Sequence, residues 1–395
     1  MKIAIIGAEN KHGGASYHHS LKTYKILSDI KEFEFNFITI DSKNDVNSHD
    51  NKKMNYNISF LDRLFFLFYS SNIFKSLLKK FSIKNKFQQF IEKKKIDLII
   101  FLGCSRLSIF CDKIDYTTYV YEFHHLFRPD LPEYKGWTDF DFRENILKKN
   151  IKQSIALIVD TEKKAEDLIK YYNCYEKKIT VIPLTPSITN SKDHRLELCS
   201  QKIKNFINSS EEFFFYPAQY WSHKNHYYIL MAIQTLNKKY KKTVNFVFTG
   251  YKKHNFDYLN KKVKEFDLGD QVKFFEYLSE NEIKILYQNC KGLVMPSLVG
   301  YSSLPLYESF YFEKPIFYTK DLLDNSLKQF VNEIDLENPN NLAREINDFD
   351  KNINNINEKI ILAKKYFIEN LSDEKIKFKY LNFFNKIKYQ TKIYK

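Results

Sequence analysis

Short apolar runs separated by amphipathic stretches recur along the whole chain of 395 residues. In the first half these runs lie at residues 2–7, 33–40, 97–103, 117–121, 155–160 and 179–182. The second half repeats the pattern at residues 213–216, 244–249, 272–275, 293–295 and 315–318. Strands that alternate with helices in this way favour parallel sheets with helices on both faces. The pattern therefore predicts an α/β protein with two Rossmann-like, doubly wound domains.

A polar stretch that follows Pro183 and Pro186 separates the two series of runs. We therefore predict an N-terminal domain at residues 1–185 and a C-terminal domain at residues 186–374. A basic helix at residues 375–395 follows, and we expect it to pack back on the N-terminal domain. Ligands of doubly wound sheets bind beyond the carboxyl ends of the strands. Two such domains that face each other would form a deep cleft for the ligand.

One stretch, residues 292–309, predicts a complete binding unit. The apolar run 292–295 is typical of a buried strand, residues 296–303 form a loop of small residues, and Pro305 suits the first turn of a helix. Free N–H groups and the helix dipole at such a position favour an anion such as phosphate. Glu308, one turn further, suits a sugar hydroxyl instead. A phosphate next to a sugar hydroxyl indicates a nucleotide.

Other positions between a strand and a helix add candidate binding groups. Lys224 lies in the loop that follows the run 213–216, where a lysine can pair with a diphosphate without a metal ion; the alternative is an ordinary surface lysine. Gly250 ends the next strand, and a substrate could approach the backbone there. Gly13 and Gly14 occupy the equivalent place in the first half, with a plain tight turn as the alternative.

Composition narrows the partners and the location. The formal net charge of +14 favours acidic partners, including phosphorylated small molecules. The sequence lacks the clusters of aromatic and basic residues that are typical of nucleic-acid binders, so we expect no nucleic-acid partner. The five cysteines form no C-x-x-C pair, which indicates reduced thiols and no zinc site. Two Asp-x-Asp strings, at 139–141 and 348–350, do not follow a buried strand, so we expect no metal site there. We expect no signal peptide and no transmembrane helix, and hence a cytoplasmic location.

Motifs of the second half, in their order and spacing, resemble the C-terminal domain of glycosyltransferase family 4. They lie at residues 216–226, 247–250, 272–278, 286–287, 296–308 and 314–315. The first half resembles the N-terminal domain of that family more weakly, at residues 13–14, 121–134, 159–162 and 178–183. Members of the family are retaining, nucleotide-sugar-dependent enzymes. The resemblance therefore implies the GT-B fold, in which two Rossmann-like domains face each other.

The resemblance also implies roles for the donor side of the site. It assigns Glu308 to the ribose and Lys224 to the diphosphate. Gln219 stands where the family has an arginine, and Gly300 stands where it has the first of two paired glutamates, as in one subset of the family. The backbone N–H groups implied to hold the diphosphate are those of Ser302, Ser303 and Leu304.

The loop after the fourth strand resembles the active-site loop of the family, which contains a histidine. Tyr121 stands in place of that histidine, so His124 or His125 is implied to contact the sugar or the leaving phosphate; the alternative is a loop histidine with a backbone partner. Glu122 and Arg128 are candidates for the acceptor side, and Arg128 is also a candidate second cation. Next to Lys224, the candidates for substrate contact are His223 and His226, with solvation at the start of a helix as the alternative.

The function implied is transfer of a hexose, mannose-like or similar, from a nucleotide sugar to a saccharide acceptor, with retention and without a metal cofactor. We expect a lipid-linked acceptor and a role in bacterial surface polysaccharide synthesis, as in capsule, O-antigen or lipopolysaccharide. The alternative is a catalytically degenerate GT-B protein that binds a saccharide or a partner. It is favoured by Gly300, Gln219, Tyr121 and Glu276, the last of which stands where the family usually has a glycine. Residues 60–81 predict an apolar and basic helix. It lies either on an anionic membrane at the inner face or in the core with a solvated basic face.

Overall fold

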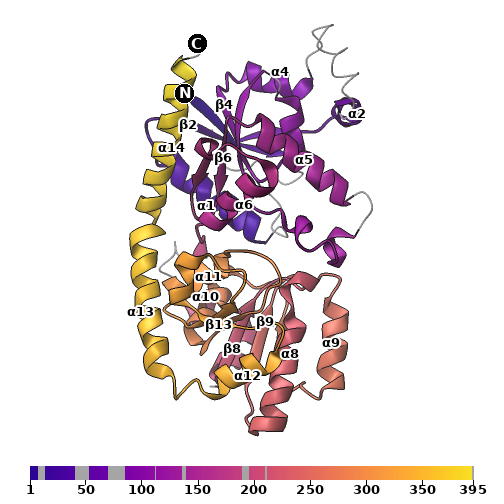
Figure 1. Cartoon of the computed structure of the whole chain (residues 1–395), viewed down its shortest axis with the longest axis vertical. Coiled ribbons are helices and arrows are strands. Elements are labelled where there is room, and N and C mark those ends of the chain that lie inside the picture. Colours follow the sequence, from indigo (N-terminus) through magenta and orange to yellow (C-terminus); the bar gives the residue numbers. More distant parts are fainter. Residues whose placement is uncertain are drawn as a thin grey trace. The chain divides into compact units, whose positions relative to one another are not determined.

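The computed structural model describes residues 1–7, 14–40, 53–69, 85–111, 113–135, 139–188, 195–209 and 211–393. The chain forms two compact units (Figure 1). The first comprises Met1–Phe123, Trp137–Thr185 and Asp373–Lys395, and the second comprises His124–Gly136 and Pro186–Ser372. Residues 124–136 therefore pack with the second unit, although in sequence they lie well before the 185/186 boundary.

A seven-stranded sheet forms the centre of the first unit, in the order β3-β2-β1-β4-β5-β6-β7. Every pair of neighbouring strands is parallel. The strands are β1 (Lys2–Ile6), β2 (Glu34–Ile40), β3 (Lys53–Tyr56), β4 (Leu98–Leu102), β5 (Asp115–Tyr119), β6 (Ala156–Val159) and β7 (Ile179–Val181). Successive residues of a strand point to opposite faces, so Ile3 and Ile5 join one core layer and Ala4 and Ile6 join the other.

Helices cover both faces of this sheet (Figure 1). They are α1 (Ala15–Ser28), α2 (Phe60–Tyr69), α4 (Lys86–Lys93), α5 (Asp139–Gln153), α6 (Glu162–Tyr172) and α14 (Asp373–Ile393). The C-terminal helix α14 belongs to this unit, where Tyr380 and Phe384 share a core layer with Ile3. The fully buried ammonium of Lys22 on α1 pairs with Asp373 at 2.6 Å. Of the helix expected at residues 60–81, the part after Tyr69 lies outside the described residues.

The second unit repeats the same architecture with six parallel strands, in the order β10-β9-β8-β11-β12-β13. The strands are β8 (Phe213–Pro217), β9 (Asn245–Thr249), β10 (Val272–Phe275), β11 (Gly292–Met295), β12 (Ile316–Thr319) and β13 (Asn332–Ile334). The helices are α7 (Gln201–Asn208), α8 (His226–Thr235), α9 (Phe256–Glu265), α10 (Glu280–Asn289), α11 (Leu304–Tyr311), α12 (Pro339–Asn347) and α13 (Ile353–Asn370). These two parallel sheets confirm the predicted α/β fold of two Rossmann-like domains.

The order of strands in the second sheet reverses between β8 and β11, which are neighbours. Ligands of doubly wound sheets bind at such a switch point, outside the carboxyl ends of the strands. The loops that leave β8 and β11 are residues 218–225 and 296–303. The fold thus brings the loop of Lys224 next to the loop that precedes α11.

Two strands were not expected from the sequence. The polar stretch up to residue 57 contains the edge strand β3, and a short strand, β13, extends the second sheet. Among the described helices, none is both long enough and apolar enough to span a membrane.

Candidate functional site

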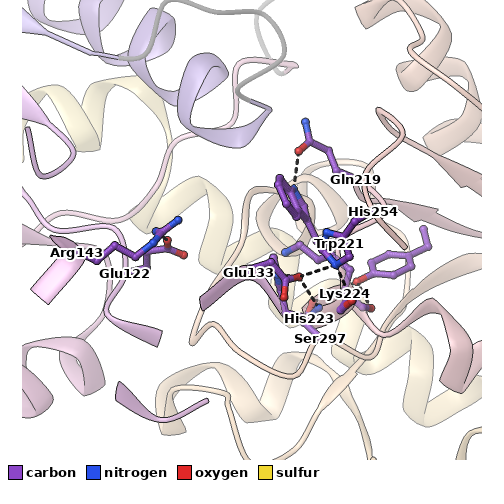
Figure 2. Close-up of polar contacts among 11 residues, drawn as sticks. Glu122, Glu133, Arg143, Gln219, Trp221, His223, Lys224, His254 and Ser297 are labelled. Atoms are coloured by element: carbon purple, nitrogen blue, oxygen red, sulfur yellow. Dashed lines mark hydrogen bonds and ion pairs between the residues drawn. The ribbon is translucent and has the colours of Figure 1, made fainter. Parts of the chain in front are cut away.

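The loops after β8 and β11 are fastened to each other (Figure 2). The hydroxyl of Tyr216, on β8, donates a hydrogen bond to the backbone carbonyl of Lys224 at 2.9 Å and lies 3.2 Å from Oγ of Ser297. The N–H of Leu298 donates to the carbonyl of His223 at 2.8 Å. These bonds hold the segment that carries Lys224 against the loop that leads into α11.

The first turn of α11 keeps few N–H groups for a ligand. Ser303 caps the helix, since its Oγ accepts from the N–H of Leu306 at 3.2 Å. Pro305 has no N–H, and the N–H of Tyr307 donates to the carbonyl of Ser303. The N–H of Leu304 is therefore the first-turn donor that points past the end of the helix, as anion binding requires.

Glu308 lies on α11, one turn from its start, and is half-buried. Its Oε2 accepts a hydrogen bond of 2.6 Å from the hydroxyl of Tyr287 on α10. Burial raises the pKa of Glu308 to about 7, although the bond from Tyr287 opposes the rise. The bond from Tyr287 thus holds the carboxyl in one orientation, and its pKa lies close to neutral pH. A sugar hydroxyl could replace Tyr287 as the hydrogen-bond donor.

Gly300 lies in the loop before α11, with φ of +106°. A β-carbon at this position would stand 3.6 Å from the carbonyl oxygen of Ser302 and 4.0 Å from Cε1 of His124. The hydroxyl of Tyr318 donates to the carbonyl of Gly300 at 3.2 Å and holds the loop in place. The position implied to have lost its carboxylate therefore faces an imidazole.

The segment 124–136 is anchored on the second unit by apolar contacts. Leu131 and Tyr134 form a small core cluster with Val299, and the buried ring of His125 lies 6.3 Å from that of Tyr134. Two short 3₁₀ helices, His124–Leu126 and Pro132–Tyr134, shape the segment. Of the two candidate histidines, His124 faces Gly300, whereas His125 packs inside the segment.

Sequence reasoning missed Glu133, which lies in this segment. Its Oε1 accepts from the backbone N–H of His223 at 3.1 Å and lies 3.0 Å from Nδ1 of the same residue (Figure 2). Burial would raise the pKa of Glu133, but the bonds from the side chain and backbone of His223 lower it to about 2. The two residues are 90 positions apart, and no local pattern around Glu133 marks it.

Gln219 and Trp221 lie at the start of the same loop. The indole N–H of Trp221 donates to Oε1 of Gln219 at 2.9 Å, and its ring is near parallel to that of His223 at 6.5 Å. Nε2 of His254 lies 2.8 Å from Oγ of Ser222 and 3.9 Å from Oε1 of Glu133. Gln219 thus contributes no charge, and His223 is the ring beside Lys224 that contacts a carboxylate.

The other candidate residues have contacts of their own. Gly14 is the N-cap of α1 in the first unit, and Gly13 lies outside the described residues. Glu122, also in the first unit, pairs with Arg143 at 3.4 Å (Figure 2). Arg128 makes a bidentate pair with Asp130, at 2.7 and 2.6 Å, and both side chains are partly exposed.

Two expectations about the loop after β8 change with the structure. A β-carbon on Gly250 would stand 2.6 Å from the carbonyl oxygen of Ala218, so it is protein backbone that approaches this glycine. His226, expected to contact substrate or solvent at the start of a helix, is fully buried between the rings of Tyr216 and Tyr220. It is a core residue.

The described residues contain no group of three or more His, Cys, Asp or Glu side chains arranged to hold a metal ion. All five cysteines are free thiols.

Residues 200–361 match the family described as "Glycosyl transferases group 1". No curated protein matches the chain. Among solved structures, HepE of Anabaena in complex with UDP and glucose is 13% identical, with a TM-score of 0.65 over 98% of this chain and 100% of that one. Sucrose-phosphate synthase of Thermosynechococcus elongatus is 12% identical, with a TM-score of 0.72 over 98% of both chains. The lipopolysaccharide outer core galactosyltransferase WaaB is 12% identical, with a TM-score of 0.61 over 98% of this chain and 100% of that one.

The fold of the chain is therefore that of the GT-B glycosyltransferases. The match to that family at residues 200–361 covers the strands β8 to β13 and both loops of the candidate site. Glycosyltransferase is thus the class of enzyme that this match and the fold together indicate.

Proposed function

We propose that the chain is a retaining glycosyltransferase that moves a hexose from a nucleotide sugar to a saccharide acceptor. The observation that carries the proposal is the pair of loops at the switch point of the second sheet, with Lys224 on one and the N-terminus of α11 on the other. A cation and a helix N-terminus side by side suit the diphosphate of a nucleotide sugar. The HepE structure contains UDP and glucose, which supports a donor of this class.

Each residue of the site would have a separate task. Lys224 and the N–H of Leu304 would stabilise the charge that grows on the diphosphate as it leaves. Glu308 would accept a hydrogen bond from a ribose hydroxyl in exchange for that of Tyr287. His124, which faces Gly300, would contact the donor sugar at the position where a glutamate is missing. We propose a front-face transfer that needs no metal cofactor, because Lys224 and α11 offer the positive charge.

The acceptor that we propose is lipid-linked, in bacterial surface polysaccharide synthesis at the inner face of the membrane. The likeness to WaaB, a lipopolysaccharide outer core galactosyltransferase, supports this class of acceptor. Helix α2 adds support, because Phe60 and Leu61 expose 74% and 48% of their surface there. Exposed apolar side chains on a basic protein suit an anionic lipid surface.

The test is release of nucleoside diphosphate from a panel of UDP-, GDP- and ADP-linked hexoses, with and without a glycolipid acceptor. We expect release from one class of donor, with a rate that falls by about 100-fold in Lys224→Ala, the scale expected for a lost group that stabilises the transition state. Lys261→Ala, at a lysine 75% exposed on α9, is the matched control and should keep the wild-type rate. No release in any condition, together with retained saccharide binding, would establish the degenerate alternative.

A further inference from the structure

Of the two carboxylate oxygens of Glu133, one contacts a histidine and the other has no hydrogen-bond partner among the described residues. Its side chain is 7% exposed. Oε1 contacts His223, whereas Oε2 is buried and has no hydrogen-bond partner in the part of the chain that the structure describes. A buried carboxylate is strongly destabilised unless a cation or several hydrogen bonds offset its charge. The charge of Glu133 therefore depends mainly on His223, which bonds to it directly, with His254 at a longer distance of 3.9 Å.

The contact with Glu133 determines which nitrogen of His223 carries a proton. The pKa of Glu133 is about 2, so it is ionised at neutral pH and can only accept hydrogen bonds. Nδ1 of His223, at 3.0 Å from Oε1, must therefore be protonated and donate. Nε2 lies at the opposite edge of the ring, directed away from the carboxylate. An adjacent carboxylate also favours protonation of Nε2, because it stabilises the imidazolium.

Several charged or titratable groups of the described residues lie around His223. Lys224 follows it in the chain, and Lys253 lies over the ring of Trp221 at 4.9 Å. His254 is 3.9 Å from Oε1 of Glu133 and bonds to Ser222. On the other side Leu298, in the loop before α11, donates to the backbone carbonyl of His223. Glu133 contacts the ring directly, so its negative charge stabilises an imidazolium at this position.

We propose that Glu133 is a positioning residue that holds His223 as an imidazolium, whose Nε2–H donates to the diphosphate of the donor beside Lys224. The inference deepens the proposed function and rests on it. Because Glu133 and His223 together carry no net charge, the pair adds a directed, charge-assisted donor, not a further positive charge. The uncharged Gln219, held by Trp221, leaves this task to His223.

The test is the dissociation constant of UDP and of GDP, measured by calorimetry from about pH 5.5 to about pH 8.5, the range in which histidine titrates. Wild-type protein should lose affinity as His223 deprotonates. Glu133→Gln should move this loss to lower pH, and His223→Gln should abolish it and weaken binding by about tenfold or more at the low-pH end. Ionisation of the diphosphate itself is common to all variants, so it cancels in the comparison. Glu337→Gln, at an exposed carboxylate, is the matched control.

Each outcome bears on the inference. The same pH profile in wild type and Glu133→Gln would overturn the role of Glu133, and unchanged binding in His223→Gln would overturn the whole inference. If wild-type protein binds neither UDP nor GDP, the titration is repeated with ADP, and failure to bind all three would instead contradict the proposed function. If Glu133→Gln does not fold, nitrogen NMR of the wild-type imidazoles decides, with His223→Gln to assign the signal. We expect Nδ1 of His223 to stay protonated at about pH 8.5, and a signal for an unprotonated Nδ1 would refute the contact.

Discussion

A β-carbon built on Gly300 would lie 4.0 Å from Cε1 of His124. The two residues are far apart in the chain, and they meet because segment 124–136 packs on the second unit through Leu131 and Tyr134. Segment 124–136 therefore presents the imidazole of His124 to the space beside Gly300. Gly300 lacks the glutamate side chain that the family has at this position, and His124, from elsewhere in the chain, lies beside it instead.

Gly300→Ala should destabilise the second unit by about 1–2 kcal/mol, the scale of strain for a side chain at an unfavourable positive φ. The new methyl group would have ordinary contact distances, so the backbone, with φ of +106°, carries the cost. Differential scanning calorimetry measures it. Gly269→Ala is the matched control, because a β-carbon there meets nothing within 4 Å, and it should leave the melting temperature nearly unchanged. Equal melting temperatures for the two variants would contradict the argument.

Between about pH 5 and about pH 7.5, the free energy of unfolding of Glu308→Gln should fall less than that of wild type. The pKa of Glu308 is raised from 4.5 to about 7 by burial. Between these values the unfolded chain releases a proton that the folded protein keeps, so wild-type stability falls as pH rises through this window. The variant lacks this loss, and we expect it to gain about 1–2 kcal/mol of unfolding free energy relative to wild type. This is less than the full linkage of ~1.4 kcal/mol per pH unit would give over the whole window, because solvent screens a half-buried group.

Melting temperatures of wild type, Glu308→Gln and the exposed control Glu337→Gln, compared at the two pH values, provide the measurement. A control that shifts as much as Glu308→Gln would show that the effect is not specific to the buried carboxyl. No pH-dependent difference between wild type and Glu308→Gln would mean that Glu308 titrates like an exposed glutamate.

The sequence was sufficient for the sheets and for the loops at the switch point, because these depend on local patterns. Apolar runs mark central strands such as β4 and β11, which are buried on both faces. The edge strand β3 was not predicted, because its sequence, Lys53–Tyr56, is half-polar. As an edge strand it pairs with β2 alone. The motifs around Lys224 and Glu308 similarly lie within single strand–loop–helix units.

The contacts of segment 124–136 could not be predicted in this way. Leu131 and Tyr134 contact Val299, and Glu133 contacts His223, only through the folded second unit. A local pattern places a residue within its own element and carries no information about a distant partner. The same limit explains His226, which follows Lys224 closely in sequence but, as the first residue of α8, points into the core against Phe248.

His226→Gln should flatten the loss of stability in acid, although it should lower stability at neutral pH by about 1–3 kcal/mol, as core substitutions do. Burial lowers the pKa of His226 from 6.5 to about 3. The unfolded chain therefore takes up a proton below about pH 6.5 that the folded protein refuses. Wild type should lose up to ~1.4 kcal/mol per pH unit from this site as pH falls toward 3. Urea or thermal unfolding at about pH 7 and about pH 5 measures the difference, and His254→Gln, at a partly exposed histidine, is the control. If His226→Gln and wild type have the same acid slope, His226 is protonated in the folded protein and cannot be the neutral core residue that its surroundings indicate.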